Sequence, residues 1–397
     1  MRRADPVGPP SAEPGEPPDT VEPHELRDLG DVERAAAAVL PAEVWDFVAG
    51  GSGREHTLAA NREAFDRVFV ASRVLRDVSA CDTATTLLGR PVRMPVAVAP
   101  VAYQRLVHPE GESASARAAR AVGVPFTVGT LSSVPVEEVT AAGGTVWFQL
   151  YWLRERGRTL DLARRAEDAG CHALMLTVDV PWMGRRLRDA RNRFTLPGRV
   201  RAAHLDGGAT SAAHLPSADG SAVAAHTAAA FSPAVTWSCV EELRAATRLP
   251  LILKGLLAPE DAVRAARLGV DAVVVSNHGG RQLDGALPGV DALPAVAEAV
   301  DGACEVLVDG GVRGGTDVLK ALALGANGVL VGRPPVWGLA AAGEAGARRV
   351  LDLLAEEFGD ALGLAGCADV ADARRLRTLR APAVSGAGPA ARVTTPP

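Results

Sequence analysis

A histidine, two glycines and an arginine stand together in the stretch VSNHGGRQLDG, residues 275–285. His278 ends an apolar, β-branched run, and Arg281 follows it three positions later. Histidine can accept a proton near neutral pH, and arginine can hold a carboxylate through two parallel hydrogen bonds. The glycines between them let backbone approach a ligand closely. The stretch therefore predicts a base beside an anchored acid; a structural histidine that satisfies a loop is the alternative.

The elements that would position these residues are eight short apolar runs with helical patterns between them. The runs are continuous rather than alternating, which is typical of parallel strands buried on both faces. Four of the helical patterns end at a glycine that can cap a helix in the left-handed conformation. Eight such units predict an α/β fold, a (β/α)8 TIM barrel, and the rival doubly wound sheet lacks a GxGxxG after its first strand. The runs occupy residues 95–100, 125–130, 145–151, 173–179, 250–255, 272–278, 305–310 and 328–332.

One domain over residues 25–377 accounts for these elements, with a helical segment at 25–90 ahead of the barrel. The longest gap follows the fourth strand, where residues 201–231 are rich in Ala, Gly, Ser and His. An insertion of this length, between the fourth strand and the fourth barrel helix, predicts a mobile lid over the site or a disordered segment. The tails at 1–24 and 378–397 are expected to be disordered, and the first is rich in Pro, Glu and Gly.

Composition narrows the classes of function. The chain has 397 residues, of which 48% are hydrophobic, and a net charge of −5. These values suit a globular protein with a large core and argue against a nucleic-acid partner. No apolar run approaches the ~20 residues of a membrane span, and the N-terminus lacks the apolar part of a secretory signal. The five cysteines form no CxxC pair, so we expect no metal site, no disulfide framework and a cytoplasmic location.

Polar side chains gather at the ends of the apolar runs, where the active sites of TIM barrels lie. Lys254 stands out because the chain has 40 arginines and only two lysines. For any single residue, such as Thr177 or Gln149, the alternative is that the side chain only satisfies backbone groups. The residues at these ends are Pro100, Val101, Ala102, Gly129, Gln149, Tyr151, Thr177, Asp179, Lys254, Ser276 and His278.

Two glycine-rich turns, DGGVRGGTD and GRP, follow the last two runs. Phosphate sites in TIM barrels commonly lie at these two loops, and N–H groups at helix starts with arginines nearby suit a dianion. The turns therefore predict a phosphate cradle, with tight packing as the alternative reason for the glycines. The candidate residues are Asp309, Gly310, Gly311, Arg313, Gly332 and Arg333.

Several motifs in combination resemble the FMN-dependent α-hydroxy-acid oxidase and dehydrogenase family over about residues 25–377. They are SNHGGRQLDG, LTVDVPWMGRRLRDARNRF, DGGVRGGTDVLKALALGA, VGRP, HPEGE and TTLLG. The resemblance implies a TIM barrel that binds FMN and oxidises a 2-hydroxy acid to the 2-oxo acid. It leaves open whether the electrons leave as a hydride or through a carbanion, and whether O2 or another acceptor receives them.

The resemblance also implies a role for each matching residue. His278 matches the catalytic base, with Asp179 as its carboxylate partner. Arg281 and Arg186 match the pair that binds the substrate carboxylate, and Tyr151 matches a tyrosine whose hydroxyl contacts the substrate. The residues implied to contact FMN are Lys254 near N1 of the ring, then Pro100, Val101, Ala102, Gln149, Thr177 and Ser276 around the flavin, and Asp309, Gly310, Gly311, Arg313, Gly332 and Arg333 at the ribityl chain and phosphate.

Two residues depart from the family pattern. Phe47, in the segment WDFV, stands where the family usually has a second substrate tyrosine, so the pocket becomes more apolar. Gly129 stands where a serine often contacts the flavin, so that hydrogen bond must come from backbone or water. The segments WDF, APVAYQ and GRRLRD resemble the 4-hydroxymandelate oxidases, which serve antibiotic pathways. An aryl substrate fits an apolar pocket that contains a phenyl ring.

Three alternatives stay open at this point. The chain resembles small-substrate lactate and glycolate oxidases of the same fold, and a flavin-binding protein without turnover would carry the same cofactor motifs. A phosphate-binding barrel such as an aldolase would explain the cradle without any flavin. The expected partners are a small 2-hydroxy acid and O2, and the family resemblance implies a homo-oligomer, often a tetramer.

Overall fold

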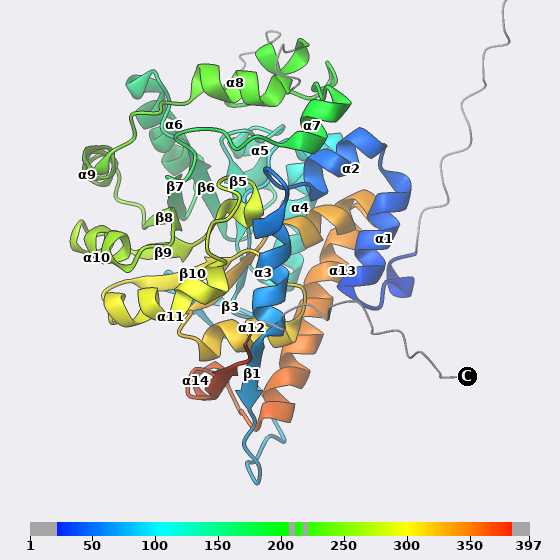
Figure 1. Ribbon diagram of the computed structural model, residues 1–397, viewed down its shortest axis with the longest axis vertical. Helices are drawn as coiled ribbons and strands as arrows, with labels where there is room; N and C mark the ends of the chain where they lie inside the picture. The colour runs from blue at the N-terminus through cyan, green and yellow to red at the C-terminus, as the bar shows by residue number, and fades with distance from the viewer. Residues whose placement is uncertain (1–21, 206–210, 217–220, 383–397) are drawn as a thin grey trace, which may run out of the picture.

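The computed structural model describes residues 22–205, 211–216 and 221–382, and within them eight parallel strands form a closed barrel (Figure 1). The strands pair in the order β10-β11-β4-β5-β6-β7-β8-β9, so strands that are consecutive along the chain lie side by side. Each strand coincides with one of the eight apolar runs, which confirms the predicted TIM barrel. The strands are β4 Val96–Val98, β5 Phe126–Gly129, β6 Val146–Leu150, β7 Ala173–Thr177, β8 Leu251–Leu256, β9 Ala272–Val275, β10 Glu305–Asp309 and β11 Gly328–Val331.

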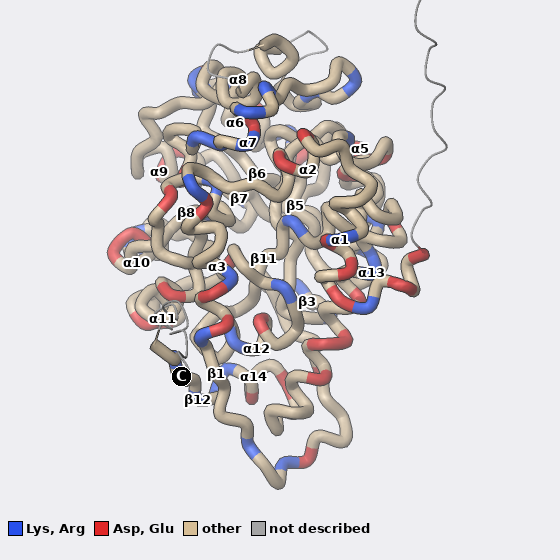
Figure 2. The backbone as a smooth tube through the Cα atoms, turned by 45° about the vertical axis from the view of Figure 1, so that its right-hand side comes forward, with Lys and Arg blue, Asp and Glu red and all other residues tan. Residues whose placement is uncertain are grey.

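Helices surround the barrel, and acidic and basic residues lie side by side along them (Figure 2). The predicted capping glycines Gly123, Gly170, Gly269 and Gly325 have φ angles of 79°, 85°, 76° and 104°, which confirms the left-handed conformation. The barrel helices are α4 Glu112–Val122, α5 Val136–Ala141, α6 Arg156–Asp168, α9 Trp237–Ala246, α10 Pro259–Arg267, α11 Gly289–Val300, α12 Gly315–Ala323 and α13 Arg333–Ala365.

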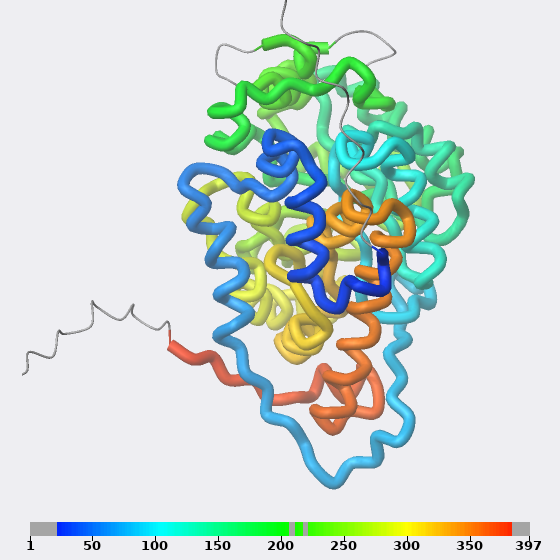
Figure 3. The backbone as a smooth tube through the Cα atoms, turned by 90° about the vertical axis from the view of Figure 1, so that its right-hand side faces the viewer, coloured from blue at the N-terminus to red at the C-terminus, as the bar shows by residue number. Residues whose placement is uncertain are grey.

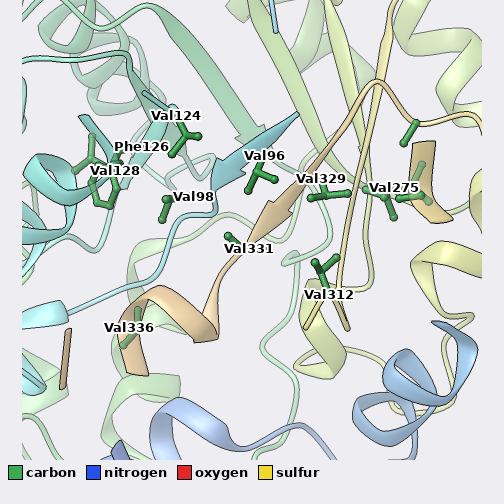
Figure 4. Close-up of a cluster of buried hydrophobic side chains, with 14 of the residues drawn as sticks. Val96, Val98, Val124, Phe126, Val128, Val275, Val312, Val329, Val331 and Val336 are labelled. Carbon is green, nitrogen blue, oxygen red and sulfur yellow. The ribbon is translucent and has the colours of Figure 1, made fainter. Parts of the chain in front are cut away.

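Side chains along each strand alternate between two apolar clusters, because successive residues of a strand point to opposite faces. Val96 and Val98 of β4 and Val329 and Val331 of β11 belong to the cluster between strands and helices (Figure 4). Ala97, between the two β4 valines, belongs to the other cluster, which fills the inside of the barrel. The inner cluster includes Ala97, Trp147, Met175, Ile252, Val274, Leu307 and Leu330.

The segment ahead of the barrel forms three helices that pack on its outside. Helix α1, dark blue in Figure 3, packs directly against α13, which is orange, and α3 packs against α11. A capping box between Asp28 and Asp31 starts α1, and Gly50 caps the C-terminus of α2. The three helices are α1 Leu29–Val39, α2 Ala42–Ala49 and α3 His56–Asp66.

A small sheet joins the segment ahead of the barrel to the C-terminal end of the described chain. Strand β1 (Val68–Ala71) pairs antiparallel with β12 (Arg377–Arg380), so ordered structure continues past the domain limit expected at residue 377. Strands β2 (Thr85–Leu87) and β3 (Arg90–Val92) form a separate hairpin. The rest of the two expected tails, residues 1–21 and 383–397, lies outside the described residues. Nor do the described ranges contain a helix with the length and apolar composition needed to cross a membrane.

The long connection between β7 and β8 carries two short helices, α7 (Leu187–Asn192) and α8 (Ala222–Ala230), over one end of the barrel (Figure 1). Residues 206–210 and 217–220 of the expected lid lie outside the described residues. The described part is fastened to the barrel through His204. Its Nε2 accepts the N–H of Val136 at 3.0 Å, and its Nδ1 lies 3.1 Å from the carbonyl oxygen of Gly129.

Burial of His204 predicts that stability depends on pH. Burial lowers the pKa of its imidazole to about 4, against the raising effect of the Thr130 and Gly129 carbonyls. An unfolded chain titrates histidine near 6.5. Between these two values the unfolded state binds more protons, so the free energy of unfolding falls by about 3 kcal/mol as the pH drops through this interval.

Urea unfolding of the His204→Gln variant across this interval measures that contribution. We expect the variant to lose this part of the pH dependence, because glutamine does not titrate. The exposed His56 provides a matched control, and His56→Gln should keep the wild-type slope. An unchanged slope in His204→Gln would contradict the assignment.

Candidate active site

A cavity lies at the C-terminal ends of the strands, and the empty space in and in front of it, with open solvent included, is about 1,210 Å³. On five strands, the last side chain that points into the barrel is polar, and the inward side chain two residues before it is apolar. Because side chains alternate with a period of two, each polar residue stands above an apolar residue that fills the barrel. The pairs are Trp147 and Gln149, Met175 and Thr177, Ile252 and Lys254, Val274 and Ser276, and Leu307 and Asp309.

Most of the predicted site residues line this cavity, although they come from distant parts of the chain. Three others, Gln149, Asp179 and Ser276, lie behind it and donate to or accept from residues that line it. A fourth, Gly129, pairs with Gln149 on the neighbouring strand. The predicted residues that line the cavity are Phe47, Pro100, Val101, Ala102, Tyr151, Thr177, Arg186, Lys254, His278, Arg281, Asp309, Gly310, Gly311, Arg313, Gly332 and Arg333.

His278 and Asp179 form a hydrogen-bonded pair between the ends of β9 and β7. The Nδ1 atom of His278 lies 2.9 Å from Oδ1 of Asp179. His278 has a φ of 60°, which side chains rarely adopt, and Ser276 Oγ holds this conformation by accepting its N–H at 3.0 Å. The hydroxyl of Ser276, at the end of the same strand, therefore helps to hold His278 in this strained backbone conformation.

The protonation state of the pair follows from its surroundings. Burial acts to raise the pKa of Asp179, but the nearby charges of His278 and Lys254 outweigh it, so the pKa lies below its usual value. An ionised carboxylate can only accept hydrogen bonds, so Nδ1 of His278 is the donor and Nε2 carries the free lone pair. The geometry thus prepares Nε2 as a base, and Asp179 stabilises the imidazolium that results.

Lys254 forms a buried ion pair at the same rim. Its Nζ lies 2.8 Å from Oδ2 of Asp309 and donates to Oγ of Ser276 at 2.9 Å. Burial acts to lower the pKa of Lys254, but Asp309 and Asp179 raise it above its usual value, so the ammonium keeps its charge. The other lysine, Lys320, only donates to a backbone carbonyl at the far side of α12, and its role is structural.

Arg186 and Arg281 bring positive charge to one wall of the cavity. Their guanidinium groups lie 5.9 and 5.6 Å from the centre of the Phe47 ring. Burial lowers the pKa of both, and the pKa of Arg281 falls further because Arg186 and Arg333 are close. Nε of Arg186 is buried without a hydrogen-bond partner in the described chain, and its ion-pair partner Asp189 is 3.9 Å away. This wall therefore favours a bound anion.

The C-terminus of α2 holds two of the cavity arginines through its carbonyl oxygens. Arg281 donates to the carbonyls of Phe47 at 2.9 Å and Gly50 at 2.7 Å. Arg333 donates to Val48 at 3.1 Å and to the same Gly50 oxygen at 2.9 Å. The C-terminal end of a helix carries partial negative charge, so it suits two cations. The side chain of Arg333, predicted to contact a phosphate, is thus engaged with α2.

Two stacked aromatic pairs close the cavity towards the lid. Phe47 stacks on Phe194 with ring centres 4.7 Å apart, and Tyr151 stacks on Phe231 at 4.2 Å. Burial raises the pKa of Tyr151, so its hydroxyl stays protonated and can donate. Sequence reasoning did not identify the lid residues of the lining, because Val223, Thr227 and Phe231 belong to no motif that marks a site. The lining residues missed from sequence include Tyr103, Leu131, Val180, Met183, Val223, Thr227, Phe231 and Gln282.

Tyr103 is the one missed residue with a usable signal in the sequence. The chain has two tyrosines, Tyr103 and Tyr151, and both line the cavity. Tyr103 lies close enough to Arg186 to raise the pKa of that guanidinium. The rarity of tyrosine in this chain therefore marked Tyr103 as a site residue, as the rarity of lysine marked Lys254.

The glycine-rich turns serve packing as well as the cavity. Gly311 has a φ of 94°, and a Cβ there would lie 2.3 Å from the carbonyl oxygen of Asn61 in α3. Gly280 packs against Leu58 of the same helix in the same way, with 2.7 Å to its Cα. Close packing on α3 therefore requires a glycine at both positions, and Gly311 lines the cavity as well, together with Gly279 and Gly310.

The residues present fit FMN. Asp309 Oδ1 is buried and lacks a hydrogen-bond partner in the described chain, which suits a ligand hydroxyl. Arg313 lines the cavity with no carboxylate partner in the described ranges, which suits a phosphate. Gln149 donates to Thr177 at 3.0 Å behind the expected place of the flavin ring, and the Lys254 ammonium would face a negative charge on that ring.

Comparisons with known proteins agree with this fit. The family model described as FMN-dependent dehydrogenase matches residues 36–379. A 4-hydroxymandelate oxidase from Amycolatopsis orientalis is 62% identical over 88% of this chain and 97% of its own length. An L-lactate oxidase from Nostoc sp. is 45% identical over 87% of this chain and 96% of its own length.

Solved structures give the same result. A crystal structure of mandelate oxidase with (S)-4-hydroxymandelic acid matches with a TM-score of 0.87 and 61% identity, and the match covers 89% of this chain and 99% of that one. Family model, relatives and structure agree along the whole barrel. The chain therefore belongs to the FMN-dependent dehydrogenase family, and its cofactor is FMN.

Proposed function

We propose that this protein oxidises an aryl 2-hydroxy acid of the mandelate type to the 2-oxo acid, while O2 is reduced to hydrogen peroxide. One observation carries the proposal: a base held by Asp179 shares an aromatic-walled cavity with the buried guanidinium groups of Arg186 and Arg281. Arg186 has a carboxylate, that of Asp189, only at 3.9 Å. The 4-hydroxymandelate oxidase and mandelate oxidase among its relatives support the aryl substrate.

Arg186 and Arg281 would bind the substrate carboxylate. A carboxylate between them relieves their mutual repulsion and supplies the partner that Nε of Arg186 lacks in the described chain. Arg281 keeps its position through the α2 carbonyls, so the binding site is formed in advance. This fixes the substrate at its acid end and directs its other substituent towards the aromatic walls.

His278 would accept the proton that the substrate loses. Its Nε2 carries the free lone pair, and Asp179 stabilises the positive charge on the ring. FMN, when bound, supplies the two-electron acceptor, held by Lys254, Asp309 and Arg313. Tyr151, as a neutral phenol, would donate its hydroxyl to the substrate.

The lining favours an aryl group over a methyl group. Phe47, Leu131, Val223 and Phe231 present apolar surface to the cavity, and burying an aromatic ring against such walls is favourable. The lactate and 2-hydroxyacid oxidases among the relatives keep a small hydroxy acid as the second candidate.

Its wider setting is also a proposal. We propose that the enzyme acts in the cytoplasm as a homo-oligomer, in the formation of a 4-hydroxyphenylglycine-type antibiotic precursor. The five free cysteines support the cytoplasmic location. The resemblance to 4-hydroxymandelate oxidases, which serve antibiotic pathways, supports the role in precursor formation. The catalytic domain would begin near residue 25 and extend at least through β12.

The proposed base can be tested by substitution. We expect His278→Ala to keep FMN and its yellow colour but to lose turnover by ~10³-fold or more, because no group remains to take the proton. Steady-state oxidation of mandelate measures the loss. The exposed His56→Ala variant is the control and should turn over normally; near-normal turnover in His278→Ala would refute the base assignment.

Phe47 can be tested as a determinant of specificity. Phe47→Tyr adds a hydroxyl beside two guanidinium groups and makes the ring wall more polar, so we expect preference to move towards smaller hydroxy acids by about tenfold. The ratio of kcat/KM for mandelate and lactate measures the shift. Phe69→Tyr, on the exposed surface of β1, is the control. An unchanged ratio would remove Phe47 from the specificity argument.

The reaction itself is tested by anaerobic mixing with a panel of 2-hydroxy acids, followed by air. We expect 4-hydroxymandelate and mandelate to bleach the flavin absorbance fastest, and air to restore it with formation of hydrogen peroxide. Fastest bleaching by lactate would favour the small-substrate candidate. A yellow protein that no hydroxy acid bleaches would be a binding protein, and a colourless protein would rule out the flavin.

A further inference from the structure

Arg313 differs from the other arginines that could meet the FMN phosphate. Its Nη1 donates only to the carbonyl of its neighbour Val312, at 2.9 Å. No carboxylate lies within ion-pair distance of Arg313 among residues 22–205, 211–216 and 221–382. Arg333 donates to the carbonyls at the end of α2, and Arg62 donates to Asp317. Arg313 is thus the arginine of this region with donors to spare.

An aromatic face takes the place of a counter-ion for Arg313. The guanidinium carbon lies 4.8 Å from the centre of the Trp337 ring. Trp337 is 1% exposed and stands four residues after Arg333, one turn into α13. Its ring packs against Trp45 of α2, with centres 6.1 Å apart and planes tilted by 32°. The three side chains form an arginine–tryptophan–tryptophan cluster.

Contact with an aromatic face and pairing with a carboxylate leave a guanidinium with different numbers of free N–H donors and a different net charge around it. A carboxylate partner would occupy N–H donors and cancel the charge that a phosphate needs. A tryptophan face attracts the cation through its ring quadrupole and orients its plane, yet accepts none of the in-plane N–H bonds. The Trp337 ring therefore contacts the face of the Arg313 guanidinium and leaves its N–H donors and its charge available to a phosphate.

We propose that Trp337, supported by Trp45, is a positioning residue that holds Arg313 for the phosphate of FMN. The proposal rests on the placement of the phosphate at the loops after β10 and β11. Through Trp45, it also gives helix α2 a part in cofactor binding.

Riboflavin gives the decisive comparison, because it is FMN without the phosphate. Flavin is removed from the full chain, and the dissociation constants for FMN and riboflavin are measured by fluorescence quenching. We expect Trp337→Leu to weaken FMN about tenfold and riboflavin less than about twofold. Trp337→Phe should stay near the wild type, because an aromatic face is kept. The exposed Trp182→Leu is the matched control and should change neither constant.

Two further measurements keep the test decisive. In an Arg313→Met background, Trp337→Leu should cause no further loss of FMN affinity, because the residue it positions is gone. Trp45→Leu, which removes the support alone, should weaken FMN severalfold without affecting riboflavin, and it decides the question if Trp337→Leu does not fold.

Three outcomes would overturn the proposal. Equal losses for FMN and riboflavin would make Trp337 a general part of the cavity wall. Additive losses with Arg313→Met would mean that the two residues act separately. A Trp337→Phe variant as weak as Trp337→Leu would exclude the aromatic face. A wild-type chain that binds FMN no better than riboflavin would instead refute the phosphate placement on which the proposal rests.

Discussion

The ion pair between Lys254 and Asp309 closes a chain of contacts that crosses the mouth of the barrel. Lys254 donates to Ser276, Ser276 accepts the N–H of His278, and His278 pairs with Asp179. These five residues come from four strand ends, β7 to β10. Each charge would be costly to bury alone, so each depends on the others. The same contacts that make the rim stable also fix the base and leave one oxygen of Asp309 for a ligand.

The helices outside the barrel take part in the site rather than only covering the fold. Helix α2 offers its C-terminal carbonyls to Arg281 and Arg333 and its Phe47 ring to Arg186 and Arg281. An arginine held by neutral groups keeps its charge, and a site that binds two anionic groups needs such charge. For this reason the cavity arginines contact carbonyl oxygens and aromatic faces. Close carboxylate partners would neutralise their charge.

The lid contributes apolar walls, whereas the barrel contributes chemistry. Phe194 and Phe231, at the two ends of the lid connection, stack on Phe47 and Tyr151. His204 links the start of the lid to the barrel at Gly129, a residue predicted to contact the flavin. Substrate preference can therefore change through the lid without disturbance of His278 and its partners, which agrees with one fold serving mandelate, lactate and other hydroxy acid oxidases among the relatives.

The sequence alone determined the eight strands and marked polar residues at the ends of five of them, because strand period and residue rarity are local signals. The roles of His278, Asp179 and Lys254 are those that the family resemblance implies. Only the tertiary structure decided what surrounds them. That Arg333 turns to α2 and that α8 lines the cavity are contacts between segments far apart along the chain, and apolar lid residues carry no chemical mark. The same holds for Trp337: a tryptophan in a helix predicts burial, and only packing shows that a guanidinium lies over its face.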